Sequence, residues 1–474
     1  MEKEVAMKAV SNKAQKLENK GAVWKKTQEL FGRPSHEWAT VDEMVYGIDD
    51  YFDAAGEEVE RLRLQAIREA FDHHYSNNLF YNRVCEARGV KPSDIETEKD
   101  FVKIPMIPDT FFKDYPSEDP KEVYQWLSRC SSVDIGKFDF KGNSLQKFLE
   151  WAEQRLNGLV LHSSGTTGHC SIMFRDKVSY GRFAYCLIKL IFFKVASEVK
   201  DDVYLLYPGP TRTYLAMGHL VASAAVIFDD DKKHFLTDRM LTMPIVRLMS
   251  TGQAQGIKEK VELQLLQRAM KKGQSDQISL LEKLSKEKKQ VAIVTFPFQL
   301  YDLMEILEKK GKRLNLGESK SFIVTAGGWK VYENIKVSEH EFAERIEKYL
   351  GIPPENYKDL YGMSEGNWGA MGCEGRYKHL VPWIYPMVLD DNLQPLGYGE
   401  WGRFAFLDPA GLSYPGFIMT GDRVRLLEKC PKCDKPGVVL EPEITRMAGA
   451  EDRGCGNLMR QLLAEDIAGS AKSK

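Results

Sequence analysis

Short apolar runs alternate with helical stretches through the middle of this 474-residue chain. Strands that alternate with helices in this way pack into a largely parallel sheet with helices on its faces. The pattern therefore predicts an α/β fold, followed at 388–439 by a region that is richer in glycine and proline and is expected to be β-rich. The strand-like runs lie at 203–207, 221–228, 291–295 and 322–325, and the helical stretches between them at 257–272 and 278–289.

Composition narrows the class of protein. A hydrophobic content of 43% and a charged content of 28% are typical of a soluble globular chain, and the formal charge of −2 gives no basic excess for nucleic-acid binding. The longest apolar stretch, residues 183–195, contains Lys189 and Lys194 and is shorter than the roughly 20 residues of a membrane span. No signal-peptide pattern begins the chain, so a cytoplasmic protein without a membrane span is expected. Its oligomeric state stays open, with a homo-oligomer as one option.

The most informative short motif is a run of hydroxyl-bearing and glycine residues that follows the apolar residues 159–161. Such residues do little packing, but glycine lets backbone N–H groups and hydroxyls converge on a phosphate. An exposed turn is the alternative interpretation, because the same residue types form ordinary loops. No lysine follows the last glycine, which excludes a Walker loop. The run comprises Ser163, Ser164, Gly165, Thr166, Thr167 and Gly168.

Two downstream elements add chemistry that suits a nucleotide. Tyr361 ends a strand-like segment and could stack on a base, and Glu365 could hold a Mg²⁺ ion that also binds phosphate. Asp422 follows a Thr-Gly turn, where its carboxylate is suited to accept ribose hydrogen bonds worth about 1.5–3 kcal/mol each. Each element alone also fits an ordinary turn. Their order along the chain is the more specific signal.

This order of motifs resembles the adenylate-forming superfamily of acyl and aryl ligases, which use ATP to convert a carboxylate into an acyl-adenylate. Finer features resemble the LuxE-type acyl-protein synthetases within it. The resemblance covers about residues 104–456 and implies the large α/β domain of these enzymes, with mixed, largely parallel sheets, a β-rich subdomain, and the mobile C-terminal domain truncated or absent. The finer features are two prolines at 104–108, Phe-Phe-Lys at 111–113, Gly-Gly-Trp-Lys at 327–330, and the segments 373–379 and 413–416.

Three regions are expected along the chain. Residues 1–103 would form a helical N-terminal lobe, and residues 104–445 the adenylate-forming core with the ATP and acyl sites. Residues 446–474 would form a short hinge-like segment, which is too short for the rotating C-terminal domain of general members. This departure favours self-acylation or a partner enzyme over a free-standing coenzyme A ligase.

The resemblance also assigns roles at the ATP site. The run 163–168 would cradle the β- and γ-phosphates. Tyr361 would lie against adenine, and Glu365 would coordinate Mg²⁺. Asp422 would bind the ribose hydroxyls. Arg446 matches a ribose- or phosphate-contacting arginine of the family, although threonine precedes it here where the family has glycine.

On the acyl side, the resemblance makes Gly327, Gly328 and Trp329 the wall between adenine and the acyl chain. Several large side chains that follow the first predicted strand are expected to line the acyl pocket. These are Tyr207, Tyr214, Met217 and His219.

Cys455 stands in an Arg-Gly-Cys-Gly context close to the C-terminus. This context resembles that of the LuxE-type cysteine that takes the acyl group from the adenylate and forms a thioester. A thiol of ordinary pKa is only a few per cent thiolate at pH 7, and the neighbouring Arg453 would favour the anion. The alternative is an unreactive small residue in a tail.

The remaining cysteines suggest a metal. Cys430 and Cys433 have the C-x-x-C spacing of a metal knuckle, and Cys373 and His379 could complete a tetrahedral, structural zinc site. Three alternatives stay open: unligated thiols on two loops, Cys455 as the fourth ligand in place of His379, and a redox role for the C-x-x-C pair, which lacks a thioredoxin-like context.

Together these features predict an ATP- and Mg²⁺-dependent ligase that activates a carboxylic acid, expected to be a fatty acid, as acyl-AMP. The acyl group would then pass through Cys455 to a partner of the acyl-CoA-reductase type. One alternative is a phenylacetate- or aryl-type acyl-CoA ligase with a reduced C-terminal domain. Another is a non-catalytic nucleotide-binding subunit of a larger assembly.

Overall fold

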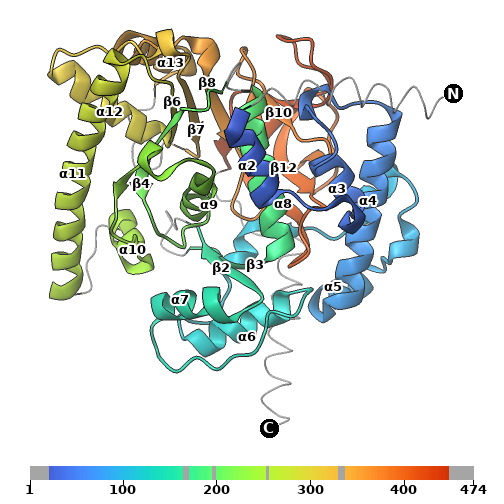
Figure 1. The fold of residues 1–474 in the computed structure, drawn as a ribbon. Coiled ribbons are helices and arrows are strands. Elements are labelled where there is room, and N and C mark those ends of the chain that lie inside the picture. The colour runs from blue at the N-terminus through green and yellow to red at the C-terminus, as the bar shows by residue number, and fades with distance from the viewer. Residues whose placement is uncertain (1–20, 164–169, 195–198, 252–255, 329–336, 448–474) are drawn as a thin grey trace.

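The computed structural model describes residues 21–163, 170–194, 199–251, 256–328 and 337–447, and places helices on both sides of a long twisted sheet (Figure 1). The helices are α2 Gly21–Phe31, α3 Thr40–Val45, α4 Glu57–Asn77, α5 Leu79–Arg88, α6 Pro120–Cys130, α7 Leu145–Arg155, α8 Lys177–Lys194, α9 Ala216–Ala224, α10 Met243–Thr251, α11 Ile257–Lys286, α12 Pro297–Lys309 and α13 Glu339–Leu350. The strands are β1 Ile107–Pro108, β2 Gly158–His162, β3 Ile172–Asp176, β4 Tyr204–Pro210, β5 Lys233–Thr237, β6 Val291–Thr295, β7 Phe322–Ala326, β8 Tyr357–Tyr361, β9 Ala370–Gly372, β10 Lys378–Leu380, β11 Tyr385–Leu389, β12 Trp401–Leu407, β13 Phe417–Leu427, β14 Val439–Leu440 and β15 Thr445–Arg446.

The sheet has a parallel part and an antiparallel part. Its strand order is β11-β12-β13-β14-β10-β9-β8-β7-β6-β4-β5, and β1 and β15 also pair with β13. Strands β4 to β8 pair in parallel. From β8 to β11 the neighbouring strands pair antiparallel. The predicted α/β fold with a later β-rich region is therefore confirmed, and β2 and β3 form a separate antiparallel hairpin.

Both faces of the parallel part are buried, as the apolar strand sequences require. Val291 and Ile293 of β6 and Ile323 of β7 pack in one core cluster with α11, α12 and α13. Their neighbours Ala292 and Val324 belong to the cluster on the other face, which includes α8. Successive strand residues point to opposite faces, so continuous apolar runs are typical of strands covered on both sides.

The N-terminal helices are joined to α8 by buried polar contacts. The Arg182 guanidinium of α8 forms two hydrogen bonds of 2.7 Å to the Asp42 carboxylate of α3, and both side chains are buried. Lys189 lies about two helical turns further along α8 and donates to the carbonyl oxygens of Val45 and Ile48. Residues 183–190 of α8 are therefore buried, and the ammonium of Lys189 is satisfied by backbone carbonyls.

Two sequence predictions of secondary structure are wrong. Residues 221–228 are not a strand but the end of α9 and a 3-10 turn at Ala225–Ile227, because a short apolar run fits either element and its alanines favour a helix. The break expected after 272 does not occur, since α11 continues through Gly273. A Cβ at Gly273 would lie 1.8 Å from the Leu236 carbonyl oxygen of β5, so glycine allows this helix to approach the strand.

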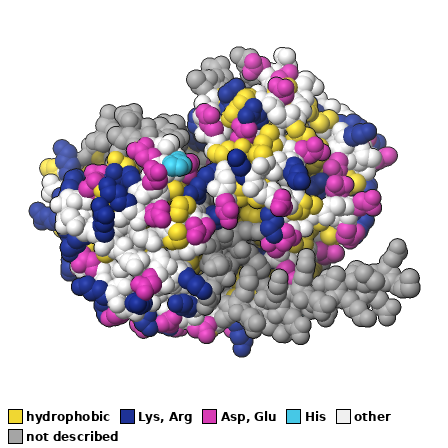
Figure 2. All heavy atoms as spheres, turned by 90° about the horizontal axis from the view of Figure 1, so that it is seen from above, with side chains coloured by type: hydrophobic (Ala, Val, Ile, Leu, Met, Phe, Trp, Pro, Cys, Tyr) yellow, Lys and Arg dark blue, Asp and Glu magenta, His cyan; other side chains and the backbone are white. Residues whose placement is uncertain are grey.

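The surface agrees with the composition. Among the described residues, none of the helices combines the length and hydropathy needed to cross a membrane. Lys and Arg side chains are interspersed with Asp and Glu side chains over the face shown in Figure 2. That face therefore lacks the broad basic region typical of nucleic-acid binding.

Candidate active site

The β2–β3 hairpin carries the run of serine, threonine and glycine between its strands. The backbone N–H of Ser163 donates to the Ser171 carbonyl oxygen at 2.9 Å, and Ser163 Oγ accepts from the Ser171 N–H at 2.8 Å. These bonds join the two ends of the run at one point of the hairpin. The remaining members, Ser164, Gly165, Thr166, Thr167 and Gly168, lie outside the described residues, so their phosphate-binding role stays a prediction.

Tyr361, Asp422 and Arg446 come together from β8, β13 and β15. Tyr361 Oη donates to Asp422 Oδ2 at 2.7 Å, and Arg446 Nε lies 3.1 Å from Asp422 Oδ1. The antiparallel register of β13 and β15 pairs Asp422 with Arg446 directly. Burial raises the pKa of Asp422, while Arg446 and the Tyr361 hydrogen bond lower it. The carboxylate is thereby held in a fixed orientation beside a cation.

Asp109 joins this group, and the sequence interpretation missed it. Its Oδ2 accepts from the Gly421 N–H at 3.3 Å and lies 3.2 Å from Arg446 Nη1. Strand β1 pairs in parallel with β13, which brings residues 109 and 421 together across the chain. Asp109 directly follows the two-proline segment 104–108, but no local pattern in the sequence pairs it with residue 421.

Glu365 follows β8 and is a buried carboxylate with no ion pair to a described cationic side chain. Ser364 Oγ donates to its Oε2 at 3.0 Å. Burial raises the pKa of Glu365, the Ser171 hydroxyl opposes that rise, and the charge of Asp109 adds to it. A buried carboxylate that lacks a cationic partner is costly, so this position fits a bound divalent cation.

The glycine turn predicted at the acyl side follows β7, the parallel neighbour of β8. Gly327 has φ of 79°, a conformation that glycine adopts without strain, and Gly327 and Gly328 are both exposed. The turn therefore lies at the carboxyl ends of the parallel strands, beside the end of β8. Ligands of open α/β sheets bind at this edge.

A cavity of about 600 Å³ lies between β4, β5 and β6 and the helices α10, α11 and α12. Phe296 lines it, and a Cβ at Gly327 would lie 3.2 Å from the Phe296 ring, so the cavity reaches the glycine turn. Much of its lining is apolar, including Leu206, Leu236, Leu263, Leu266, Met270 and Leu303. The four side chains expected to line the acyl pocket are not among its lining residues: Tyr207, Tyr214, Met217 and His219.

The four predicted metal ligands also come together. The ligand atoms of Cys373, His379, Cys430 and Cys433 all lie within 4.8 Å of one another. Cys373 Sγ is 3.8 Å from Cys430 Sγ, and Cys433 Sγ is 3.2 Å from His379 Nε2. Zn–S bonds of ~2.3 Å in a tetrahedron place two sulfurs about 3.8 Å apart, so the donor set and spacing fit zinc.

The remaining predicted site residue, Cys455, lies outside the described residues. It therefore stays a candidate on sequence grounds. Among the described candidates, Tyr361, Asp422 and Arg446 form one group, and Cys373, His379, Cys430 and Cys433 form another.

The fold is shared with a class of solved proteins, the adenylate-forming ligases. A structure of 2-hydroxyisobutyryl-CoA ligase in complex with 2-HIB-AMP and CoA aligns with a TM-score of 0.54 and 16% identity, covering 89% of this chain and 75% of that chain. An open conformation of the same ligase aligns with a TM-score of 0.53 and 15% identity, over 82% of this chain and 70% of the other. The fold predicted from the sequence is confirmed.

Within that class, the chain is similar to the LuxE-type acyl-protein synthetases. Residues 270–464 match the family model described as acyl-protein synthetase, LuxE. The chain is 23% identical over 410 residues to a long-chain-fatty-acid–luciferin-component ligase of Vibrio harveyi, covering 85% of this chain and 89% of the relative. It is 23% identical over 417 residues to the Aliivibrio fischeri ligase of that name, covering 87% and 91%. The resemblance predicted from the sequence is confirmed.

Proposed function

We propose that this chain is an ATP-dependent ligase that activates a fatty acid as an acyl-adenylate and then transfers the acyl group to a thiol. One observation carries the proposal: Tyr361, Glu365 and Asp422 converge with the Ser163 hairpin in a fold shared with an acyl-AMP-bound ligase. The two bacterial relatives are similar over at least 85% of this chain and of their own length. Their names favour a long-chain fatty acid as the substrate.

The first step needs no protein nucleophile. A carboxylate oxygen of the acid attacks the α-phosphorus of ATP, the bond from that phosphorus to the bridging oxygen breaks, and pyrophosphate leaves. The protein contributes positioning and charge neutralisation. Asp422 would hold the ribose hydroxyls, and Ser163 would lie at the phosphate end. Glu365 would hold Mg²⁺, which neutralises charge on phosphate oxygens when bound.

The second step would use Cys455. Its thiolate attacks the acyl carbonyl carbon, the bond from that carbon to the AMP oxygen breaks, and the products are a protein thioester and AMP. The Arg-Gly-Cys-Gly context supports this role, and the match to the LuxE family model extends past this residue. The thioester would then be delivered to a partner that reduces acyl groups.

The cavity between α11 and the parallel strands would take the acyl chain. Its volume of about 600 Å³ lies within the usual ~300–1,000 Å³ of small-molecule sites, and its apolar lining suits an alkyl chain. Phe296 connects it to the glycine turn, beyond which the Tyr361 and Asp422 group lies. The acid would therefore place its carboxylate at the turn and its tail between the helices.

Exchange of labelled pyrophosphate into ATP tests the adenylation step. The assay compares fatty acids of several lengths with aromatic acids. We expect exchange only with the fatty acids, and Glu365→Gln should abolish most of this exchange. Exchange with aromatic acids alone would instead indicate an aryl-type acyl-CoA ligase. No exchange with any acid would indicate a non-catalytic nucleotide-binding subunit.

Transfer to Cys455 is tested separately. Radiolabelled fatty acid with ATP should label the protein, and Cys455→Ala should remove the label while pyrophosphate exchange continues. A Cys455→Ala protein that still carries the label would disprove this assignment.

A second proposal concerns the cysteine–histidine cluster, which would hold one structural zinc ion. Its four donors would complete a closed tetrahedral site without an open position, as in structural zinc sites. His379 is buried and stacks on Phe52 at 4.8 Å, so the centre would also tie the antiparallel strands to the N-terminal region.

A further inference from the structure

One buried arginine is not used by the proposed reaction. Arg175, on β3, is 1% exposed, and its guanidinium lies 4.5 Å from the centre of the Phe183 ring. Its Nε and Nη1 have no hydrogen-bond partner among the described residues. A buried guanidinium without a carboxylate partner is costly, so its remaining contacts need an explanation.

Apart from a longer hydrogen bond of 3.4 Å from its Nη2 to Tyr414 Oη, the hydrogen bonds of Arg175 go to the turn that carries Glu365. Arg175 Nη2 donates to the carbonyl oxygens of Ser364 at 2.5 Å and Gly366 at 2.7 Å. Tyr414 Oη donates to the carbonyl oxygen of Glu365 itself at 3.0 Å. Three successive carbonyls are therefore held by two side chains from outside the turn.

A fourth contact fixes the exit of the turn. The backbone N–H of Asn367 donates to Asp408 Oδ2 at 2.7 Å, and Asp408 is fully buried. Within residues 364–367 the backbone is thus restrained at every residue, and the Glu365 carboxylate is the group left to face the site. A carboxylate with so little freedom is pre-oriented for a ligand.

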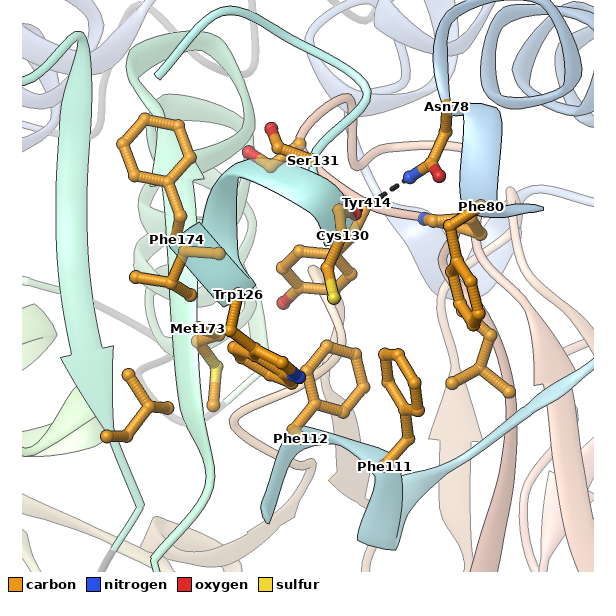
Figure 3. Close-up of a pocket in the computed structure, with 15 residues that line it drawn as sticks. Asn78, Phe80, Phe111, Phe112, Trp126, Cys130, Ser131, Met173, Phe174 and Tyr414 are labelled. Atoms are coloured by element: carbon orange, nitrogen blue, oxygen red, sulfur yellow. Dashed lines mark hydrogen bonds between the residues drawn. The ribbon is translucent and has the colours of Figure 1, made fainter. Parts of the chain in front are cut away.

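Tyr414 is itself held rigidly. Figure 3 shows its ring in an aromatic cluster with Phe112 and Trp126, and its ring centre lies 4.9 Å from that of Phe112. The cavity beside this cluster measures only about 10 Å³, roughly the space of one water molecule, so the ring is closely packed. Next to it, Ser413 Oγ donates to Asp176 Oδ2 at 2.6 Å, which ties this segment to the end of β3.

We propose that Arg175 is a positioning residue: it fixes the Glu365 turn relative to the β2–β3 hairpin that carries Ser163 and Ser171. Arg175 and Ser171 belong to one side of that hairpin, and the Ser171 hydroxyl faces the Glu365 carboxylate. The hairpin residues Ser163 and Ser171 and the Glu365 carboxylate would therefore keep a constant separation. This inference rests on the proposed function, because it concerns the role of Glu365 there.

The test compares Arg175→Met, Arg175→Lys and Tyr414→Phe in acid-dependent pyrophosphate exchange over a range of Mg²⁺ concentrations. Arg175→Met should lower the rate about 10- to 100-fold and raise the half-saturating Mg²⁺ concentration about tenfold. Arg175→Lys should recover part of both, since one amine reaches one carbonyl, and Tyr414→Phe should raise half-saturation about threefold. Arg345→Lys, at an arginine of α13 that pairs with Glu305, serves as the matched control.

The inference would be overturned if the folded Arg175→Met and Tyr414→Phe proteins kept the half-saturating Mg²⁺ concentration of the wild type, even if their exchange rate fell. A wild type without exchange would instead reject the proposed function. The inference would then be decided by melting temperature. ATP with Mg²⁺ should raise the melting temperature more than ATP with EDTA does. This difference should be smaller in Arg175→Met and recover in Arg175→Lys. An unchanged shift in Arg175→Met, or no metal-dependent shift in the wild type, would overturn it.

Discussion

The carboxylate group around Glu365 and the cysteine–histidine cluster are both assembled from distant segments, yet they differ in how complete they are. The cluster brings four donors within 4.8 Å of one another, the number of ligands that a tetrahedral structural zinc site uses. At the other site, Arg446 pairs with Asp109 and Asp422, whereas Glu365 has no ion pair to a described side chain. We infer that a resident metal ion completes the cysteine–histidine cluster, whereas the site around Glu365 is completed only by its substrates.

The largest expected effect comes from Glu365→Gln. An uncharged amide cannot replace the carboxylate toward Mg²⁺, so we expect acid-dependent pyrophosphate exchange to fall about 10²–10³-fold, with the protein still folded. Glu339→Gln, at another carboxyl whose pKa is raised by burial, is the matched control and should keep its rate. A Glu365→Gln enzyme within threefold of the wild type would place the metal-binding carboxylate elsewhere.

Cys430→Ser tests whether the cysteine–histidine cluster binds a metal. Loss of one ligand should remove one equivalent of zinc, measured by metal analysis, and lower the melting temperature by more than about 5 °C. Cys186→Ser, at a buried cysteine of α8 outside the cluster, should leave the zinc content unchanged. Zinc-free wild-type protein, or a Cys430→Ser protein that retains its zinc, would contradict the metal centre.

Leu266→Trp tests where the acyl chain lies. Leu266 is buried and lines the cavity, so a larger side chain should block a long alkyl chain but admit a short one. We expect exchange with hexadecanoate to fall about tenfold and exchange with octanoate to change little. Leu265→Trp, on the exposed side of the same helix, is the control. Equal losses with both acids would assign the tail to another pocket.

The smallest expected effect is on the pH dependence of stability. Because burial raises the pKa of Glu365, the folded state binds its proton more tightly than the unfolded state does. The wild type should therefore lose stability relative to Glu365→Gln as the pH rises above about 4.3, by about 1.4 kcal/mol per unit of pKa difference. Urea unfolding between pH 4 and 7 measures this. A difference that stays constant with pH would show that Glu365 is solvated.

Sequence reasoning succeeded where the signal was local or chemical. The apolar run 291–295 became β6 with the same bounds, and the four cysteine–histidine donors met as predicted, because their residue types limit the options. It failed for 221–228, where an apolar run suits a helix as well as a strand. It also missed Asp109, Arg175 and Tyr414. Their roles depend on contacts such as the parallel pairing of β1 with β13, which no local pattern encodes.

Oxygen-isotope transfer tests the central claim most directly. The protein is incubated with ATP, Mg²⁺, hydroxylamine and hexadecanoate that carries ¹⁸O in its carboxylate, and the nucleotide products are analysed by mass spectrometry. Attack on the α-phosphorus, followed by cleavage of the acyl–oxygen bond by hydroxylamine, predicts AMP with one ¹⁸O atom. Formation of ADP together with inorganic phosphate that carries ¹⁸O, or formation of AMP without the label, would contradict an acyl-adenylate.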